Sequence, residues 1–367
     1  MKKKLQVLHI ISSFNQGGAE VLLSDLIHSR HQCNFELHVI ANAKGPLLSD
    51  IQNSGFEVTI LKRKGIDYQF MRYTRKYIKE NRPDIVHVHD IMNGWNVLLA
   101  GLFLDVKIVF TVHGWGRPRK KYLLMKFVDH ICYVSNALKN HINAHQPGKE
   151  TILYNGILPS KFIHSEHSVR KELNVSDNKF LMGFVGNFNT VRDQLTVCKA
   201  LKHLKEQGID FTFLFVGAAH IQKLYDVCYS YCEAHNLLDN VKFLGSRSDV
   251  PEILAALDLF VYSSNHDTFG IAVVEAMMSG TPVVVNDLDV FKEITDEGRY
   301  ASLYKTKDEA SLAQNIHHLI QNTEERNELG LRGKQWAEKN YSIEAHIHQL
   351  NKLYSELLAN GSVNRHP

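Results

Sequence analysis

Apolar and polar residues follow two different patterns of spacing along the chain. Short apolar runs rich in Val, Ile and Phe are typical of buried strands, and the segments between them, such as residues 19–29 and 67–80, repeat apolar residues at helical spacing. Strand–helix alternation of this kind predicts parallel sheets with helices on both faces. The strands expected in the first part of the chain are residues 6–11, 35–41, 57–61, 85–89, 107–112, 130–134 and 151–154.

A second series of strands and helices follows a polar stretch. The Asn155-Gly156 turn and the polar residues up to Asp177 separate the two series, so we expect the linker there. The sequence predicts an α/β fold of two Rossmann-like domains, residues 1–160 and 161–340, and a terminal helix over 341–359 that packs back on the first domain. The strands expected in the second domain are residues 181–185, 212–216, 242–244, 259–262 and 282–285.

Length and composition limit the class of protein. A chain of 367 residues exceeds one ordinary core, and 44% hydrophobic with 22% charged residues is typical of a globular protein. The longest apolar run, residues 97–104, is far shorter than the roughly 18 residues that span a bilayer, so no transmembrane helix is expected. Five dispersed cysteines suit reduced core thiols, which favours a cytoplasmic protein.

Positive charge is concentrated in the first part of the chain. Residues 1–155 hold 21 Lys/Arg against 12 Asp/Glu, and residues 156–367 hold 21 against 27. The basic clusters at 62–64, 72–82 and 117–121 are either solvated faces or a surface for anionic lipid headgroups or a phosphate-bearing substrate. No recognisable nucleic-acid module accompanies them, so nucleic acid is not expected as a partner.

Candidate binding residues in the first domain follow its strands, because ligands of parallel sheets bind beyond the carboxyl ends of the strands. Gly17 and Gly18 open a helix after the first strand, where backbone N–H groups can meet a phosphate, although a tight structural turn explains them equally well. His113 ends the fifth strand and can bind a sugar hydroxyl or a phosphate. The His87-x-His89-Asp90 stretch lacks a convincing third ligand, so no metal is expected.

Candidate residues in the second domain surround two strand ends. Gly186 and Asn187 follow one strand, and Arg192 close behind them can donate several fixed hydrogen bonds to a diphosphate. The stretch from Asp267 to Gly280 runs from a strand into a helix. The amides of its residues 269–272 are expected to face a phosphate as unpaired donors.

Two carboxylates, Asp267 and Glu275, bracket this helix start. Anions beside a phosphate raise the electrostatic energy unless each one binds hydroxyl groups. Sugar and ribose hydroxyls meet that need, so the pattern favours a nucleotide-sugar ligand.

Taken together, these residues resemble the retaining glycosyltransferases of family four, which have the GT-B fold, and the similarity extends over nearly the whole chain. Asp267 and Glu275 match the E-x7-E motif of that family. The supporting elements are GGAE at 17–20, TVHG at 111–114, VSN at 134–136, YNGI at 154–157 and GSRSDVPEILAALDLFVYSS at 245–264.

The resemblance implies a UDP- or GDP-linked sugar held mainly by the second domain and a glycan or lipid-linked acceptor held mainly by the first. It implies transfer with retained anomeric configuration, no bound metal and no cofactor. The implied catalytic residues are His113, which contacts the donor sugar, Asp267, which binds its hydroxyls, and Arg192, which binds the diphosphate. The implied donor-binding residues also include Gly17, Gly18, Gly186, Asn187, Phe269, Gly270, Ile271 and, at the ribose, Glu275.

Some positions depart from the family pattern. Asp267 stands where a Glu is usual, and Asn187 stands where an Arg is common. We assign no metal to Asp287-x-Asp289. The chain is thus expected to be a transferase of cell-surface polysaccharide or glycolipid synthesis, located in the cytoplasm and peripherally at the inner membrane face. Two alternatives remain: a nonhydrolysing nucleotide-sugar epimerase and a non-catalytic sugar-nucleotide-binding scaffold.

Overall fold

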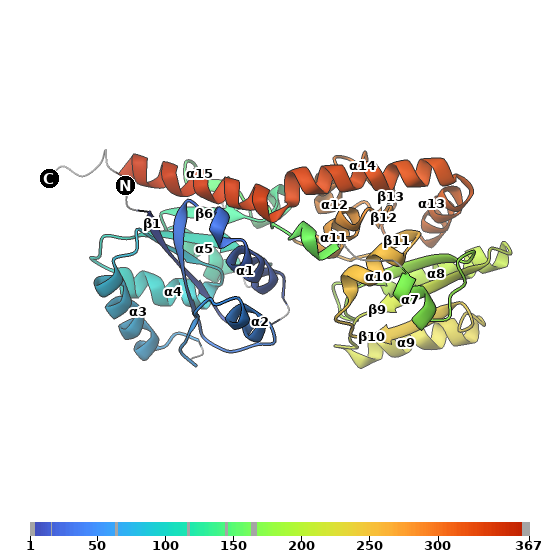
Figure 1. Cartoon of the computed structure of the whole chain (residues 1–367), viewed down its shortest axis with the longest axis horizontal. Helices are drawn as coiled ribbons and strands as arrows, with labels where there is room; N and C mark the ends of the chain where they lie inside the picture. Colours follow the sequence, from blue (N-terminus) through green and yellow to red (C-terminus); the bar gives the residue numbers. More distant parts are fainter. Residues whose placement is uncertain are drawn as a thin grey trace. The chain divides into compact units, whose positions relative to one another are not determined.

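The computed structural model describes residues 4–15, 17–62, 65–115, 118–143, 146–162 and 167–361. The chain divides into two compact units (Figure 1). The first unit comprises Met1–Leu158 and Tyr341–Pro367, and the second comprises Pro159–Asn340. Each unit is built on one sheet of parallel strands.

The first unit has a seven-stranded sheet in the order β3-β2-β1-β4-β5-β6-β7. The order reverses between β1 and β4, so the loops that follow these two strands diverge and leave room for a ligand. The strands are β1 (Leu5–Ile11), β2 (Phe35–Ala41), β3 (Thr59–Ile60), β4 (Ile85–Val88), β5 (Lys107–Val112), β6 (His130–Tyr133) and β7 (Glu150–Ile152).

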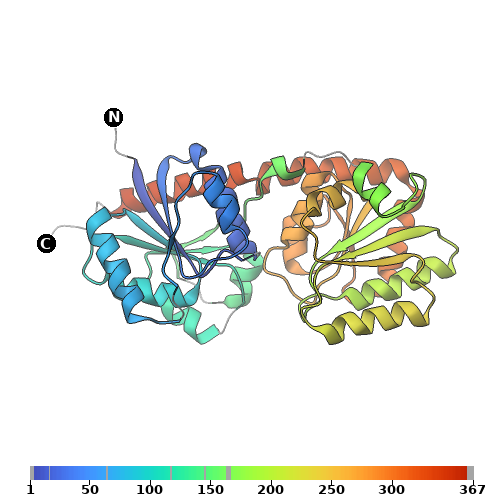
Figure 2. The ribbon, with the colours of Figure 1, turned by 60° about the horizontal axis from the view of Figure 1, so that its bottom comes forward.

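Helices cover this sheet in two groups (Figure 2), which explains why β4 is buried along its whole length. One group contains α1 (Gly18–His28), α2 (Leu48–Asn53) and α15 (Ile343–Gly361), and the other contains α3 (Tyr68–Asn81), α4 (Ile91–Gly101) and α5 (Pro118–Met125). The short helix α6 (Asn136–Ile142) follows β6. Asp67 and Asp90 cap α3 and α4 by accepting from the Phe70 and Asn93 amides at 2.8 and 2.9 Å.

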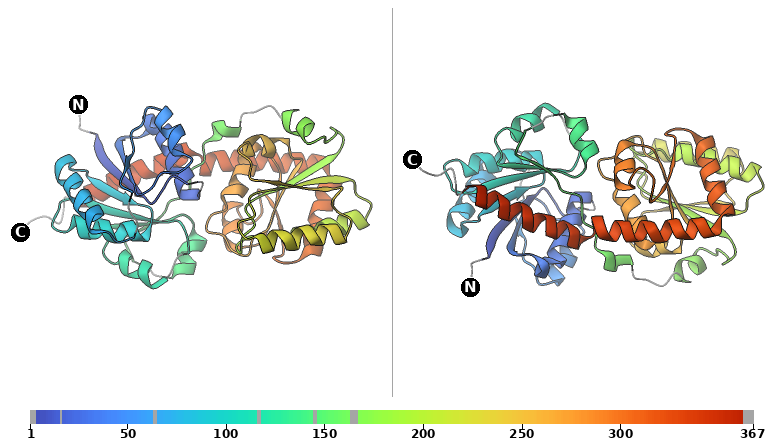
Figure 3. Two further views of the ribbon diagram at one scale, coloured as in Figure 1. Left: turned by 90° about the horizontal axis from the view of Figure 1, so that it is seen from below. Right: turned by 90° about the horizontal axis from the view of Figure 1, so that it is seen from above.

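The terminal helix α15 belongs to the core of the first unit although it is remote in sequence (Figure 3). Its apolar stripe packs into one cluster with residues of β1, β2 and α1. Ser342 caps the helix through the Ala345 amide at 3.2 Å, and His346 Nδ1 lies 2.6 Å from the Tyr154 carbonyl oxygen. The residues of the stripe in this cluster are Ile343, Ile347, Leu350, Leu353 and Tyr354.

The second unit has a six-stranded sheet in the order β10-β9-β8-β11-β12-β13, which reverses between β8 and β11. Its strands are β8 (Phe180–Val185), β9 (Phe211–Val216), β10 (Val241–Gly245), β11 (Leu259–Tyr262), β12 (Val283–Asn286) and β13 (Ser302–Tyr304). Its helices are α7 (His167–Glu172), α8 (Gln194–Glu206), α9 (Gln222–Ala234), α10 (Val250–Ala256), α11 (Ile271–Ser279), α12 (Asp289–Ile294), α13 (Glu309–Gln321) and most of α14 (Thr323–Tyr341).

Sequence analysis overlooked the edge strand β13. Its sequence, Ser302-Leu303-Tyr304, contains no β-branched residue and begins with a polar one, so it lacks the apolar run that is typical of the other strands. The prediction of buried, reduced cysteines is confirmed, because all five are free and buried. Among the described residues, no helix combines the length and the hydropathy needed to cross a membrane.

Candidate functional site

The loops after β8 and β11 meet where the strand order of the second unit reverses. The Asp193 amide donates to the Ser263 carbonyl at 3.1 Å, and the Asn265 amide donates to the Val191 carbonyl at 2.8 Å. These backbone bonds join the two loops side by side. They bring Arg192 and Asp267 together at the carboxyl edge of the sheet.

Arg192 forms the positive centre of this site. Its Nη1 lies 2.8 Å from Asp267 Oδ2 and 3.1 Å from Ser264 Oγ, and its guanidinium carbon lies 5.2 Å from the centre of the Tyr262 ring. Burial alone lowers the pKa of Arg192, but Tyr262 and Asp267 outweigh burial and raise it above its ordinary value. The guanidinium is therefore charged at every physiological pH.

Asp267 stabilises the turn that leads into α11 with its other oxygen. Oδ1 accepts from the amides of Thr268, Phe269 and Gly270 at 2.8, 3.3 and 3.1 Å. The expectation that the amides of Phe269 and Gly270 are unpaired is therefore wrong for this structure. The reason is that a short aspartate side chain accepts from the backbone amides that directly follow it and forms a turn before the helix, whose N-cap, Gly270, has no side-chain hydrogen bond.

The remaining predicted residues of this stretch lie on or next to α11. Gly270 has φ +90°, and a Cβ there would lie 2.8 Å from Phe291 Cε1, so only glycine fits. Phe269 is buried, whereas Ile271 and Glu275 are half-buried and share one helix face at i,i+4 spacing. Burial raises the pKa of Tyr262, the Arg192 charge opposes this rise, and the charges of Asp267 and then Glu275 add to it.

The side chain of Asn187 carries no charge, and it stabilises the loop after β8. Its Oδ1 accepts from the Ala218 amide at 2.8 Å, and Gln194 Nε2 donates to the carbonyls of Gly186 and Asn187 at 3.3 and 3.2 Å. A Cβ at Gly217 would lie 2.3 Å from the Gly186 carbonyl oxygen, so the loops after β8 and β9 touch at their backbones. These contacts hold the loop that carries Arg192.

Sequence analysis did not single out Tyr262, Ser264 or Gln194. The Tyr262 ring makes a cation–π contact with the Arg192 guanidinium. Ser264 Oγ accepts from Arg192 and donates to the Val191 carbonyl at 2.6 Å. The sequence contains a signal for Tyr262 and Ser264, because Tyr262 ends β11 and Ser264 lies three residues before Asp267. Polar side chains at the carboxyl ends of parallel strands are candidates for ligand binding.

In the first unit, Gly17 and Gly18 begin α1 as predicted, with Gly17 at the N-cap. Glu20 folds back over this helix start, since a Cβ at Gly17 would lie 2.4 Å from Glu20 Oε2. Burial raises the pKa of Glu20, with a smaller contribution from Asp90. Residue 16 of this loop lies outside the described residues.

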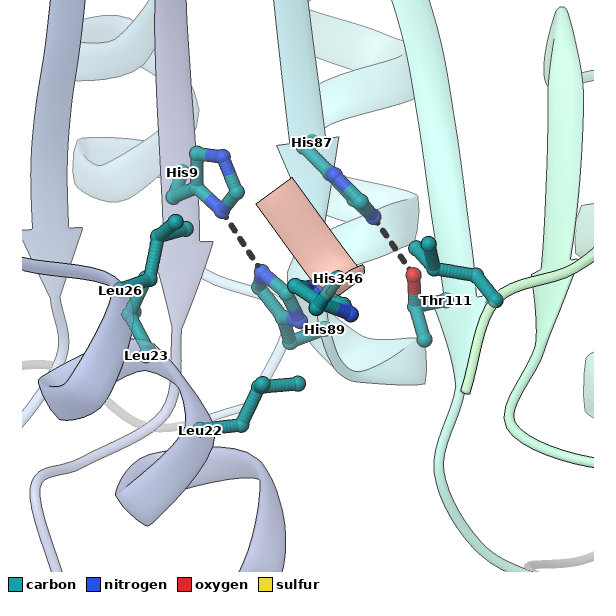
Figure 4. A pocket seen from close by; sticks show the side chains of 9 residues that line it. His9, Leu22, Leu23, Leu26, His87, His89, Thr111 and His346 are labelled. Atoms are coloured by element: carbon teal, nitrogen blue, oxygen red, sulfur yellow. Dashed lines mark hydrogen bonds between the residues drawn. The ribbon is translucent and has the colours of Figure 1, made fainter. Parts of the chain in front are cut away.

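His113 follows β5 and is held by a second histidine. Its Nε2 lies 2.9 Å from His89 Nδ1, and burial, with His346 and Lys121 nearby, lowers the pKa of His113 to about 3. His113 is therefore a neutral hydrogen-bonding group at physiological pH. The expectation that His87 and His89 lack a convincing third ligand is corrected, because the parallel sheet places His9 beside them, and one nitrogen of each ring lies within 4.8 Å of the others (Figure 4).

The basic cluster at 117–121 is described only at its end. Arg117 and the side chains of Arg119 and Lys120 lie outside the described residues. Lys121, expected on the surface, is 4% exposed, and burial lowers its pKa to about 8. It is therefore not part of a surface patch.

The structure thus gathers the predicted residues into two groups, one in each unit. His113, Gly17 and Gly18 lie at strand ends or helix starts of the first unit. The second group lies around the junction of β8, β11 and α11: Gly186, Asn187, Arg192, Asp267, Phe269, Gly270, Ile271 and Glu275.

Comparison with known proteins gives the family. The model described as "Glycosyl transferases group 1" matches residues 165–336, and the model described as "Glycosyltransferase Family 4" matches residues 16–161. An Escherichia coli UDP-Gal:alpha-D-GlcNAc-diphosphoundecaprenol alpha-1,3-galactosyltransferase is 26% identical over 70% of this chain and 72% of its own length.

Solved structures agree on the fold. A glycosyltransferase from Rickettsia africae superposes with a TM-score of 0.88 at 15% identity, covering 98% of this chain and all of its own. Anabaena HepE, in complex with UDP and glucose, superposes with a TM-score of 0.83 at 21% identity, covering 96% of this chain and 99% of its own. With two family models that together match most of the sequence, the chain belongs to the group 1 glycosyl transferases and has their GT-B fold of two parallel-sheet units.

Proposed function

We propose that this glycosyltransferase moves a sugar from a UDP- or GDP-linked donor to a hydroxyl of a glycan or lipid-linked acceptor, with retained anomeric configuration, in the synthesis of a cell-surface polysaccharide or glycolipid. The observation that carries the proposal is the permanently charged Arg192 at the strand-order reversal of the second unit, beside the start of α11. The name of the Escherichia coli relative supports a UDP-sugar donor and a lipid diphosphate acceptor.

Arg192 stabilises the departing nucleoside diphosphate in this proposal. Its Nη1 is engaged by Asp267 and Ser264, while its Nε is buried and has no hydrogen-bond partner among the described residues. Charge that develops on the diphosphate oxygens strengthens the attraction to a guanidinium that is already in place, so the transition state gains more than the ground state.

The transfer step balances without a metal. The bond between the anomeric carbon and the diphosphate oxygen breaks, and the acceptor oxygen bonds to the same face of that carbon. The acceptor proton passes to a phosphate oxygen of the leaving group, so the products are the glycosylated acceptor and the protonated nucleoside diphosphate. Asp267 binds hydroxyls of the transferred sugar, Glu275 binds the ribose, and His113 contributes an uncharged hydrogen bond to the donor sugar.

The first test is calorimetric binding of UDP, GDP, ADP and NAD to the purified protein, with magnesium and then with EDTA. We expect micromolar binding of UDP or GDP that EDTA leaves unchanged, because Arg192 supplies the positive charge. Binding that disappears with EDTA would contradict the metal-free mechanism. An epimerase would interconvert the sugar nucleotide without an acceptor, and a scaffold would bind it without turnover.

We further propose peripheral contact of the first unit with an anionic membrane. The helix α3 exposes Arg72, Lys76 and Lys79, and Arg75 Nη1 ties it to the end of α4 by donating to the carbonyls of Ala100 and Leu102 at 2.8 and 2.7 Å. The large apolar residues exposed on α3 or just after α4 are Tyr68, Tyr73, Leu102 and, at 98% exposure, Phe103. Basic residues beside exposed aromatic side chains are typical of interfacial membrane binding.

The membrane contact predicts that a variant with Arg72→Gln, Lys76→Gln, Lys79→Gln and Phe103→Ser loses binding to vesicles containing anionic lipid. Each neutralised charge removes about 1 kcal/mol of attraction to the surface. Vesicle cosedimentation measures the loss. The matched control neutralises three exposed lysines of the second unit, Lys223, Lys305 and Lys339. Equal binding by the two variants would contradict this surface.

A further inference from the structure

Four histidines of the first unit form one hydrogen-bonded chain that ends at His113. His9 and His89 lie on β1 and directly after β4, and they are joined at 2.9 Å, as Figure 4 shows. Tyr354 on α15 links this pair to His87. In order, the contacts are Thr111 Oγ1 to His87 Nε2 (2.6 Å), His87 Nδ1 to Tyr354 Oη (2.6 Å), Tyr354 Oη to His9 Nε2 (3.2 Å), His9 Nδ1 to His89 Nε2 (2.9 Å) and His89 Nδ1 to His113 Nε2 (2.9 Å).

Three of the four histidines are buried, His113 is half-buried, and the chain is uncharged. His9 and His87 are paired in register on β1 and β4 and are each 1% exposed, and His89 is 8% exposed. Burial lowers the pKa of His9 to about 3, and burial also lowers the pKa of His87 and of His89 well below the ordinary value. Each ring therefore carries one N–H and one bare nitrogen at neutral pH.

Hydrogen counting leaves two arrangements of the chain. The Tyr354 hydroxyl has one hydrogen, so it donates to one histidine and accepts from the other. If it donates to His9, then His9, His89 and His113 each carry hydrogen on Nδ1, and His87 donates from its own Nδ1. If Tyr354 donates to His87, the single ring N–H hydrogen of each of the four histidines lies on Nε2.

We propose that this chain sets the ring tautomer of His113. His9, His87, His89 and His113 then all share one tautomer. Tyr354 and His89 act as positioning residues for the sugar contact. The functional part rests on the proposed role of His113, since the polarity of the chain decides whether His113 Nδ1 donates to a donor-sugar oxygen or accepts from a hydroxyl. The shared tautomer itself follows from the hydrogen-bond order alone.

A metal ion is the competing interpretation of the same cluster. His9, His87 and His89 lie close enough together to suggest one. However, all six of their ring nitrogens already have a protein partner, so a metal would have to displace several of these bonds. A hydrogen-bonded chain accounts for every nitrogen without a further group.

The test is the long-range ¹H–¹⁵N spectrum of the histidine rings in the full-length, ¹⁵N-labelled protein at neutral pH. We expect four neutral rings in one shared tautomer. Two different tautomers among them, an imidazolium ring, or stoichiometric bound zinc in the purified protein would overturn the proposal. This result does not depend on activity, so it stands even if no sugar nucleotide binds.

Turnover tests the positioning role. Tyr354→Phe removes one oxygen from the middle of the chain and is expected to lower kcat about fivefold to tenfold, while the affinity for UDP or GDP stays unchanged. The matched control is Tyr133→Phe, a buried tyrosine of the same unit whose hydroxyl lies 3.9 Å from Met125 Sδ. If both variants have the same kcat, Tyr354 has no positioning role.

Discussion

Replacement of Arg192 by methionine is expected to lower kcat by about 10² to 10³, the usual loss when one preorganised charge-stabilising donor is removed. Methionine retains much of the volume of the side chain over Tyr262 but removes the charge beside the diphosphate. Affinity for UDP or GDP should fall in the same calorimetric titration, because the guanidinium also binds the ground state. The assay is turnover of the sugar nucleotide identified by that titration.

Stability separates a catalytic loss from a folding defect. Without Arg192, Asp267 keeps its three amide donors, so we expect the free energy of unfolding to fall by only about 1–3 kcal/mol. The matched control is Arg247→Met, whose guanidinium binds Glu172 and Asp249 away from α11 and should leave turnover unchanged. Wild-type kcat in Arg192→Met would contradict the leaving-group role.

The second large effect is expected for Asp267→Asn. The asparagine oxygen can still accept from the amides of the turn before α11, so the fold should survive, but its NH₂ group then faces the Arg192 guanidinium in place of a carboxylate oxygen. We expect kcat to fall by about a hundredfold, because a charged hydrogen bond to sugar hydroxyls is lost. Nucleotide affinity should be kept, because Arg192 is released from its ion pair.

Asp267→Glu tests why the shorter acid is present. Glutamate restores the family pattern, but its extra methylene displaces the carboxylate from the three amides, so we expect a lower melting temperature than in the wild type. Asp249→Asn, in the Arg247 ion pair, is the control for charge loss elsewhere in the second unit. Unchanged turnover in Asp267→Asn would leave this residue as a stabiliser of the turn before α11 without a role in transfer.

Local patterns were sufficient for most of the fold. The predicted bounds of β2, β5 and β11 agree with the structure to the residue, and α11 (Ile271–Ser279) lies within the stretch 267–280 that was predicted to run from a strand into a helix. Burial on both faces makes such strands continuously apolar, and glycine marks the helix ends, so a window of a few residues carries the signal. The missed strand β13 reads Ser302-Leu303-Tyr304, which is not continuously apolar and carries no such signal.

The site was predictable in its residues but not in its contacts. Arg192 and Asp267 were both expected to bind the donor, yet nothing in their spacing shows that they form an ion pair across 75 positions. Nor does the spacing show that Asp267 occupies the amides of Phe269 and Gly270. That contact depends on the exact backbone path into α11, including the positive φ of Gly270.

The sequence by itself determined the class of fold, the two parallel-sheet series, the strand ends that carry polar residues and the resemblance to family four, because each of these depends on neighbours along the chain. Only the tertiary structure decided that His9 stands beside His87, that Tyr354 from the last helix joins them, and that His113 is half-buried and neutral. The physical reason is that such contacts depend on strand order and helix packing. These are set by burial summed over the whole unit and leave no periodic trace in the local sequence.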